Sequence, residues 1–188
     1  MRRWMRKGVA VPVGAVLVIV LDQLTKHWVR VRIPLNTSWQ PVPWLDPIFT
    51  FTHTRNTGAA FGLFGGMNTV FIILALVVVI AILAIYRHLA EQSWLLRTAL
   101  ALQLGGAASN LIDRVTVGYV TDFFNLRWWP IFNVADASIV VGTVLLAIYA
   151  LFFEQAEAVQ GSASGDQGQV PRAASEVGDP SDVAPPSG

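Results

Sequence analysis

The sequence contains no cysteine, only three histidines and few charged residues. Without cysteine, the chain can form no disulfide, offer no Cys nucleophile and carry no lipid on a cysteine. The histidines are scattered and match no metal-ligand spacing, so we expect no metal and no cofactor. The H-E-x-x-H, G-x-S-x-G and presenilin-type G-x-G-D motifs are all missing, which argues against zinc, serine and presenilin-type peptidase chemistry.

The low content of charge indicates a membrane protein. Charged residues make up 13% of the chain and hydrophobic residues 54%, whereas soluble domains carry about 25% charged residues. The formal net charge is only +1 and no basic stripe is present, so we expect no nucleic-acid partner.

Four apolar segments are each close to the ~20 residues that a membrane-spanning helix needs. Backbone polar groups in lipid have to be satisfied within the segment, so we predict a membrane all-α fold with four transmembrane helices. The seven tryptophans all lie at segment ends or in connecting loops, which is typical of membrane–water interfaces. A basic region precedes the first segment, but no small-residue cleavage site follows it, so we expect a retained anchor. The predicted spans are about 9–29, 68–86, 95–112 and 135–153.

The segments outside the spans differ in character. In the first loop, about 31–66, several prolines are followed by a period-two alternation at Phe49–Thr54, which predicts a strand in a small β-cradle on the membrane surface. Residues 155–188 are rich in Gly, Ser, Ala, Pro and acidic groups, which predicts a disordered low-complexity tail. We therefore assign residues 1–154 to one integral-membrane domain.

Two aspartates, Asp122 and Asp136, lie in an aromatic and apolar stretch next to the fourth predicted span. A carboxylate beside a membrane span is costly, which makes it a candidate functional group. Two carboxyl groups held close together cannot both ionise, so such a pair can supply the ionised and the protonated member that peptide hydrolysis requires. A structural interpretation also stands, in which Asp136 caps its helix and Asp122 pairs with Arg114 or Arg127.

Two further polar motifs lie at predicted helix ends. Asn110 and Arg114 are spaced i, i+4, so they share a helical face and can point at a substrate or a headgroup, with Asp113 displaced from it. The alternative is helix packing with an interfacial arginine. Asp22 and Lys26 have the same spacing, and we interpret them as a structural ion pair at the interface.

Small residues form two motifs with simple structural interpretations. The stretch Gly105–Ala108 favours close helix packing in lipid. The loop Asn56–Gly62 is compact enough for a peptide backbone to approach, and Asn56 offers an amide with both a donor and an acceptor. An ordinary turn leading into the second span explains this loop equally well.

Five sequence blocks follow one another along the chain: Asp22–Lys26, Asn56–Gly62, Gly106–Arg114, Gly118–Phe123 and Phe132–Asp136. In this order they resemble the signature of the bacterial lipoprotein signal peptidases, also called signal peptidase II, over about residues 8–154. The resemblance implies a multi-pass enzyme of the bacterial inner membrane with an outward-facing β-cradle. It also implies cleavage of diacylglyceryl-modified prolipoproteins before the lipidated cysteine, and inhibition by the cyclic peptide globomycin.

The resemblance also implies roles for individual residues. The aspartates of the G-x-V-x-D-F and F-N-x-A-D blocks map onto Asp122 and Asp136 as the catalytic pair. The tail lies outside the resemblance, and 125–131 is a variable part of the family. The implied substrate-binding residues are Asn56, Gly58, Asn110, Arg114 and Asn133.

A small transporter or proton carrier is the main alternative function, because it too would place aspartates at membrane depth. A transporter, however, would carry charges near the middle of the membrane and often show inverted repeats. Here the acids lie at the ends of spans, on the face shared by the first and third connecting loops. A membrane scaffold, the third class, would not need both carboxylates. We expect both termini in the cytoplasm, an extracytoplasmic site, prolipoproteins and lipids as partners, and a monomer.

Overall fold

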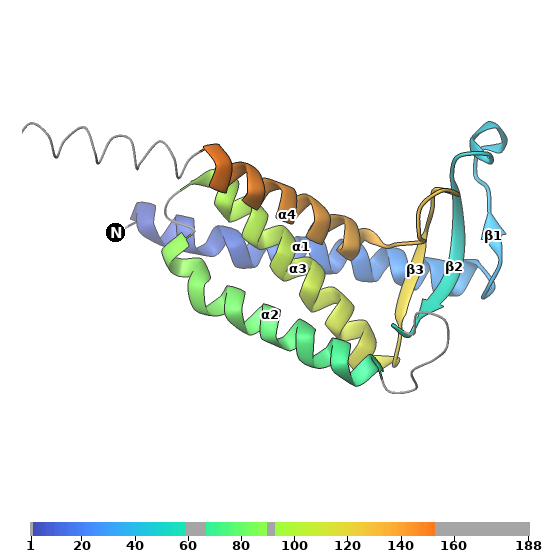
Figure 1. Ribbon diagram of the computed structural model, residues 1–188, viewed down its shortest axis with the longest axis horizontal. Helices are drawn as coiled ribbons and strands as arrows, with labels where there is room; N and C mark the ends of the chain where they lie inside the picture. The colour runs from blue at the N-terminus through green and yellow to red at the C-terminus, as the bar shows by residue number, and fades with distance from the viewer. Residues whose placement is uncertain (1, 59–66, 90–92, 153–188) are drawn as a thin grey trace, which may run out of the picture.

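The computed structural model describes residues 2–58, 67–89 and 93–152. It consists of a helix bundle with a small sheet at one end (Figure 1). In chain order the helices are α1 (Arg2–Arg32), α2 (Met67–Leu89), α3 (Trp94–Thr116) and α4 (Val134–Phe152). The strands are β1 (Ser38–Trp39), β2 (Thr50–Asn56) and β3 (Val120–Asn125), with the 3-10 turn η1 (Pro43–Leu45) between β1 and β2. The predicted tail at 155–188 lies outside the described residues.

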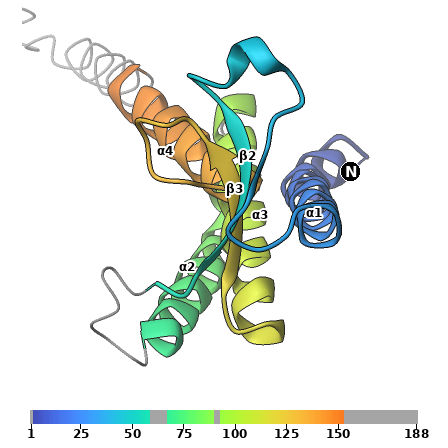
Figure 2. The same ribbon diagram turned by 90° about the vertical axis from the view of Figure 1, so that its right-hand side faces the viewer.

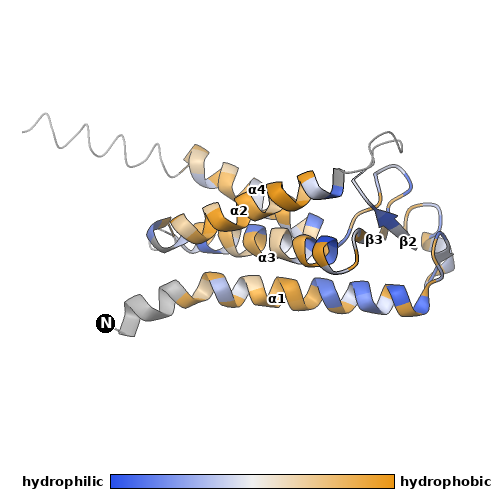
Figure 3. Ribbon diagram, turned by 90° about the horizontal axis from the view of Figure 1, so that it is seen from below, coloured by the Kyte–Doolittle hydropathy of each residue, from blue (hydrophilic) through white to orange (hydrophobic). Residues whose placement is uncertain are grey.

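The helix α3 is the centre of the bundle. It packs against α1, α2 and α4, and most of its buried residues are leucine, alanine and glycine. The other helices turn long apolar surfaces outward, as the hydropathy colouring shows (Figure 3). Surfaces of this kind are stable only against lipid or another protein.

Three of the described helices are long and apolar enough to cross a membrane, at Val9–Arg32, Asn68–Tyr86 and Val134–Phe152. The remaining predicted span, 95–112, falls on α3, whose 23 residues are sufficient in length. Its sequence is interrupted by polar residues, among them Ser109, Asn110 and Asp113, which contact other helices. The count of four spans therefore remains a prediction.

Glycines bring the backbones of neighbouring helices into close contact, as the small-residue motif predicted. A Cβ atom added at Gly105 would lie 2.6 Å from Cβ of Val18 on α1. One added at Gly106 would lie 2.5 Å from the carbonyl oxygen of Ala135 on α4. Since real Cβ atoms do not approach other atoms so closely, α3 can contact both neighbours only with glycine at these positions.

The sheet has the antiparallel order β1-β2-β3 and stands across the ends of α1 and α4 (Figure 2). An irregularity between Phe51 and Thr54 shifts the β2–β3 register, so that Thr54 pairs with Asp122. An aromatic cluster that includes Phe51, Phe123 and Phe124 packs this sheet against the end of α1.

The strand predicted at Phe49–Thr54 is confirmed by β2. The first loop supplies β1 and β2, and β3, which follows α3, supplies the third strand of the sheet. No alternation revealed β3 in the sequence, since its first four residues are all buried. Residues 59–66, the end of the predicted cradle, lie outside the described residues.

The close contact at Gly106 generates a testable prediction. Substitution Gly106→Ala should push α4 away from α3 and lower the free energy of unfolding by roughly 1–3 kcal/mol, as overpacking does. The matched control is Ala84→Leu, which adds atoms on the exposed face of α2. The midpoint of thermal unfolding in detergent is measured for both variants. An unchanged midpoint for Gly106→Ala would show that α3 and α4 separate at no cost in stability.

Candidate active site

Asp122 lies in the middle of β3 with its side chain turned toward the helix bundle. The residue is only 2% exposed. Its Oδ2 accepts a hydrogen bond from Nδ2 of Asn56 at 2.9 Å, and its Oδ1 accepts one from Nδ2 of Asn133 at 2.7 Å. In the described part of the chain it forms no ion pair with Arg114, and Arg127 instead pairs with Asp46. The interpretation of Asp122 as half of a simple ion pair is therefore not supported.

Asp136 lies in the first turn of α4 and takes part in a reciprocal cap. Its backbone N–H donates to Oδ1 of Asn133 at 2.9 Å, and its Oδ2 accepts from the backbone N–H of Asn133 at 3.2 Å. This is a capping box, which satisfies two otherwise unpaired donors at a helix start. The structural interpretation of Asp136 is thus correct, but it uses only one of the two carboxyl oxygens.

Two buried asparagines join the aspartates. Asn133 contacts both carboxyl groups, Asp122 through its side-chain amide and Asp136 through its backbone N–H. Asn110, on α3, donates from Nδ2 to Oδ1 of Asp136 at 2.7 Å and accepts at Oδ1 from Nδ2 of Asn133 at 3.3 Å. The four residues come from β3, α3 and the start of α4, so folding brings together groups that are distant in sequence.

The electrostatic environment keeps the proton on Asp122 up to an unusually high pH. The pKa of Asp122 is raised to about 6, first by burial and then by the neighbouring charge of Asp136. Hydrogen bonds from Asn56 and Asn133 and the charge of Lys26 act in the opposite direction. A carboxyl group that titrates near neutral pH suits general acid–base chemistry.

The turn after β2 holds Asn56 in its orientation. Oδ1 of Asn56 accepts from the backbone N–H of Gly58 at 2.9 Å, which leaves Nδ2 to face Asp122. Gly58 has a φ of +76°, and an added Cβ would collide with the ring of Phe71. The turn interpretation and the proximity to Asp122 therefore both hold, while Ala59–Gly62 lie outside the described residues.

An apolar groove of about 240 Å³ runs along the bundle from this site, between α2, α3 and α4. Arg114 lies on its wall with the guanidinium 5.1 Å from the ring centre of Phe71. Its Nε is buried and has no hydrogen-bond partner among the described residues. The residues that line the groove are Phe71, Leu74, Ala75, Val78, Gln103, Ala107, Asn110, Arg114 and Ile139.

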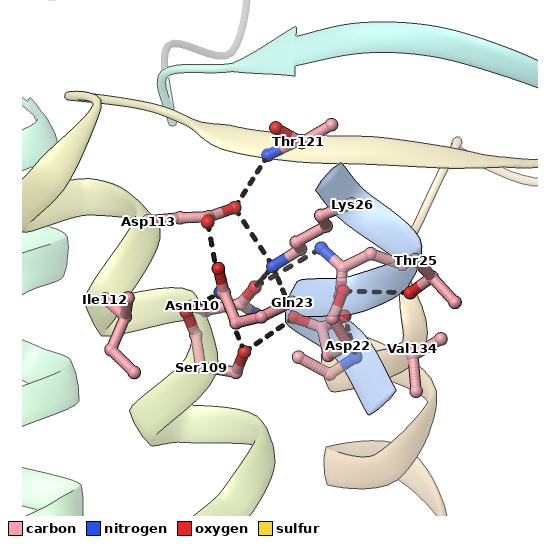
Figure 4. Close-up of polar contacts among 12 residues, drawn as sticks. Asp22, Gln23, Thr25, Lys26, Ser109, Asn110, Ile112, Asp113, Thr121 and Val134 are labelled. Atoms are coloured by element: carbon pink, nitrogen blue, oxygen red, sulfur yellow. Dashed lines mark hydrogen bonds and ion pairs between the residues drawn. The ribbon is translucent and has the colours of Figure 1, made fainter. Parts of the chain in front are cut away.

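The sequence did not reveal a buried ionic cluster behind the two aspartates. The ion pair between Lys26 and Asp22 forms as predicted, at 2.7 Å, but both residues are fully buried and do not lie at an exposed interface. Asp113, displaced from the Asn110 face, turns toward α1 and approaches Lys26 to 3.1 Å (Figure 4). The charged spacing in an otherwise apolar helix was the only available signal, and it does not distinguish a buried pair from an exposed one.

No group of three or more potential metal-binding side chains occurs among the described residues. The site is instead built from two carboxyl groups, amides and one nearby arginine.

A family model described as Signal peptidase (SPase) II matches residues 14–152. The chain belongs to the signal peptidase II family. It is 47% identical to the lipoprotein signal peptidase of Moorella thermoacetica over 132 residues, which cover 70% of this chain and 86% of that protein. It is 41% identical to the lipoprotein signal peptidase of Halothermothrix orenii over 133 residues, covering 71% and 89%. Membership of this peptidase family and the apolar helices identify a multi-pass membrane protein.

The fold is also similar to that of a solved bacterial membrane enzyme. The two structures superpose with a TM-score of 0.69 at 33% sequence identity, covering 78% of this chain and 94% of the other. A second structure of a bacterial membrane enzyme gives a TM-score of 0.68 at 32% identity, covering 77% and 88%.

The hydrogen bond from Asn56 leads to a prediction about titration. Because Nδ2 of Asn56 stabilises the ionised form of Asp122, Asn56→Ala should move the pKa of Asp122 upward from about 6. The pH dependence of the Asp122 carboxyl ¹³C shift measures this directly. The control is Asn125→Ala, which removes an asparagine of the same sheet that bonds Thr52. Equal pKa values in both variants would contradict the assigned role of Asn56.

Proposed function

We propose that this protein is an aspartic endopeptidase that removes signal peptides from diacylglyceryl-modified prolipoproteins, cleaving before the lipidated cysteine. The observation that carries the proposal is the joining of Asp122 and Asp136 through Asn110 and Asn133, in a chain of the signal peptidase II family. The relatives named above are lipoprotein signal peptidases.

The chemistry requires one ionised and one protonated carboxyl group. The ionised member takes a proton from water while the water oxygen attacks the scissile carbonyl carbon, and the protonated member donates a hydrogen bond to the carbonyl oxygen. When the tetrahedral intermediate collapses, the C–N bond breaks and the leaving nitrogen takes up a proton from the pair. The products are the carboxylate of the signal peptide and the free amino group of the lipidated cysteine.

The remaining site residues would hold the substrate. The unpaired Nε of Arg114 and the amide of Asn56 can bind carbonyl oxygens of an extended peptide, and the backbone N–H of Gly58 holds the Asn56 amide in its orientation. The groove beside them is apolar enough to receive the apolar part of the substrate. Because the substrate is already anchored in the bilayer, its search for the site is confined to the membrane, which lowers the entropy cost of binding.

The protein would lie in the bacterial inner membrane with both termini in the cytoplasm. It would cross the membrane four times, with α3 as a span in addition to the three more apolar helices. The basic residues ahead of the first span support a cytoplasmic N-terminus. The sheet and the start of α4, which carry Asp122 and Asp136, lie at the end of α1 remote from the N-terminus, which would be the extracytoplasmic side (Figure 1). Such an enzyme would act as a monomer without a metal and would be inhibited by globomycin.

Substitution of either aspartate tests the reaction. Asp122→Asn and Asp136→Asn should each reduce cleavage of a purified diacylglyceryl-prolipoprotein by at least about 10²-fold, because an amide can neither activate water nor share the proton. The matched control is Asp46→Asn, which changes an exposed aspartate paired with Arg127 and should retain activity. The shift of the substrate on a gel, with and without a chelator, is the measurement.

Normal turnover by either dyad variant would refute the aspartic mechanism. Loss of wild-type activity in chelator would instead point to a metal-dependent reaction.

A further inference from the structure

Lys26 is a cation without access to solvent, and all of its hydrogen-bonding capacity is used. A lysine ammonium group has three N–H donors and no acceptor. Nζ of Lys26 lies 2.7 Å from Oδ2 of Asp22, 3.1 Å from Oδ2 of Asp113 and 2.9 Å from Oδ1 of Asn110. Figure 4 shows Lys26 of α1 pointing toward Asn110 and Asp113 of α3, next to Asp22 of its own helix. Two of the contacts are ion pairs, and the third leads directly to the aspartate pair.

The contact with Asn110 decides which way its side-chain amide points. An amide can rotate by half a turn and exchange its oxygen and nitrogen with little change in shape. Because Lys26 can only donate, the oxygen of Asn110 has to face Lys26, and the nitrogen then faces Oδ1 of Asp136. The same oxygen accepts from Asn133, whose nitrogen also donates to Asp122. Because Lys26 can only donate, it fixes the orientation of the Asn110 amide, and through Asn133 the same contact determines which N–H groups face both aspartates.

A second route from the cluster reaches the start of α4. Oδ1 of Asp22 accepts a hydrogen bond at 2.9 Å from the backbone N–H of Ala135, the residue before Asp136. Oδ2 of Asp22 is held by Lys26 and by Oγ of Ser109 at 2.7 Å. Asp22 therefore satisfies one of the N–H groups that a helix start leaves unpaired, and it fixes α4 against α1.

We infer that Lys26 is a positioning residue for peptide hydrolysis, which acts through Asn110 to keep an N–H donor on Asp136 and hold the two aspartates in register. The inference rests on the proposed function. It goes beyond it because Lys26 contacts neither aspartate of the pair and does not line the groove. A purely structural ion pair would need only Asp22 and Asp113 as partners, and the bond to Asn110 would be incidental.

The test removes the donor while keeping the cluster neutral. Lys26→Met alone would leave the buried carboxylate of Asp22 without a cation and could prevent folding. The double variant Lys26→Met/Asp22→Asn removes one positive and one negative charge together, and leaves Asp113 opposite Arg30, which lies 3.4 Å away. Its kcat and KM are measured with a diacylglyceryl-prolipoprotein, per mole of folded enzyme. The matched control is Ser109→Ala, which breaks hydrogen bonds in the same cluster but none made by the Asn110 side chain.

We expect kcat of the double variant to fall at least tenfold while KM stays within threefold, because Lys26 does not touch the substrate. Ser109→Ala should keep the wild-type kcat and lose only thermal stability. The fall in kcat caused by the double variant should vanish when Asn110 is already alanine, since Lys26 then has no amide to orient. An unchanged kcat, or a loss that persists in full beside Asn110→Ala, would overturn the inference.

A second variant and an assay of the wild-type enzyme separate failure of this inference from failure of the proposed function. If the Met variant does not fold, Lys26→Gln/Asp22→Asn replaces it in the same cycle with Asn110→Ala. A glutamine amide can accept as well as donate, so it no longer fixes the orientation of the Asn110 amide. A loss of kcat that vanishes beside Asn110→Ala is expected, and an unchanged kcat or additive losses would overturn the inference. The wild-type enzyme is assayed first. No cleavage by the wild type would refute the proposed function, whereas cleavage with unaffected variants would refute only the role of Lys26.

Discussion

The constraint on which the structure depends is that two carboxyl groups have to be held beside a membrane with every oxygen hydrogen-bonded. Asp122 accepts from Asn56 and Asn133, and Asp136 accepts from the amide of Asn110 and the backbone of Asn133. Each of the four oxygens thus has an N–H donor. A buried polar group without a partner costs about 1–3 kcal/mol. Because the donors come from β2, α3 and the residue before α4, this requirement is met only when the sheet and the bundle are both assembled.

The structural and chemical interpretations of Asp136 are compatible because a carboxylate has two oxygens. The capping box occupies Oδ2 and orients the carboxyl group from within its own helix. Oδ1 then accepts the hydrogen bond from Nδ2 of Asn110. A helix start is a favourable place for a reactive carboxylate, since the unpaired N–H groups and the helix dipole stabilise negative charge there. The feature that first suggested a simple cap is therefore also what positions the group for chemistry.

Local sequence patterns predicted the features that depend on neighbouring residues. The apolar segments, the strand at β2, the helix-packing glycines and the pairing of Asp22 with Lys26 all follow from spacing within one element. The strand β3 could not be predicted in this way, because burial of both its faces removes the alternation and its pairing partner lies far away in the sequence. The positions of Asp122 and Asp136 beside shared asparagines likewise result from tertiary packing. From the residues alone both interpretations of the pair stayed open, and it was the family resemblance that favoured the catalytic one.

The burial of Lys26 shows why composition is an incomplete guide to a membrane bundle. The face of α1 that turns inward also carries Ala15 and Val18, which lie in close contact with Gly105 of α3. That contact brings the charged face of α1 against the polar face of α3, where Asn110 and Asp113 receive it. Ser109, Asn110 and Asp113, three of the polar residues of α3, are thus enclosed by protein. A helix at the centre of a bundle can therefore be polar enough to escape a hydropathy criterion for the same reason that it can organise an active site.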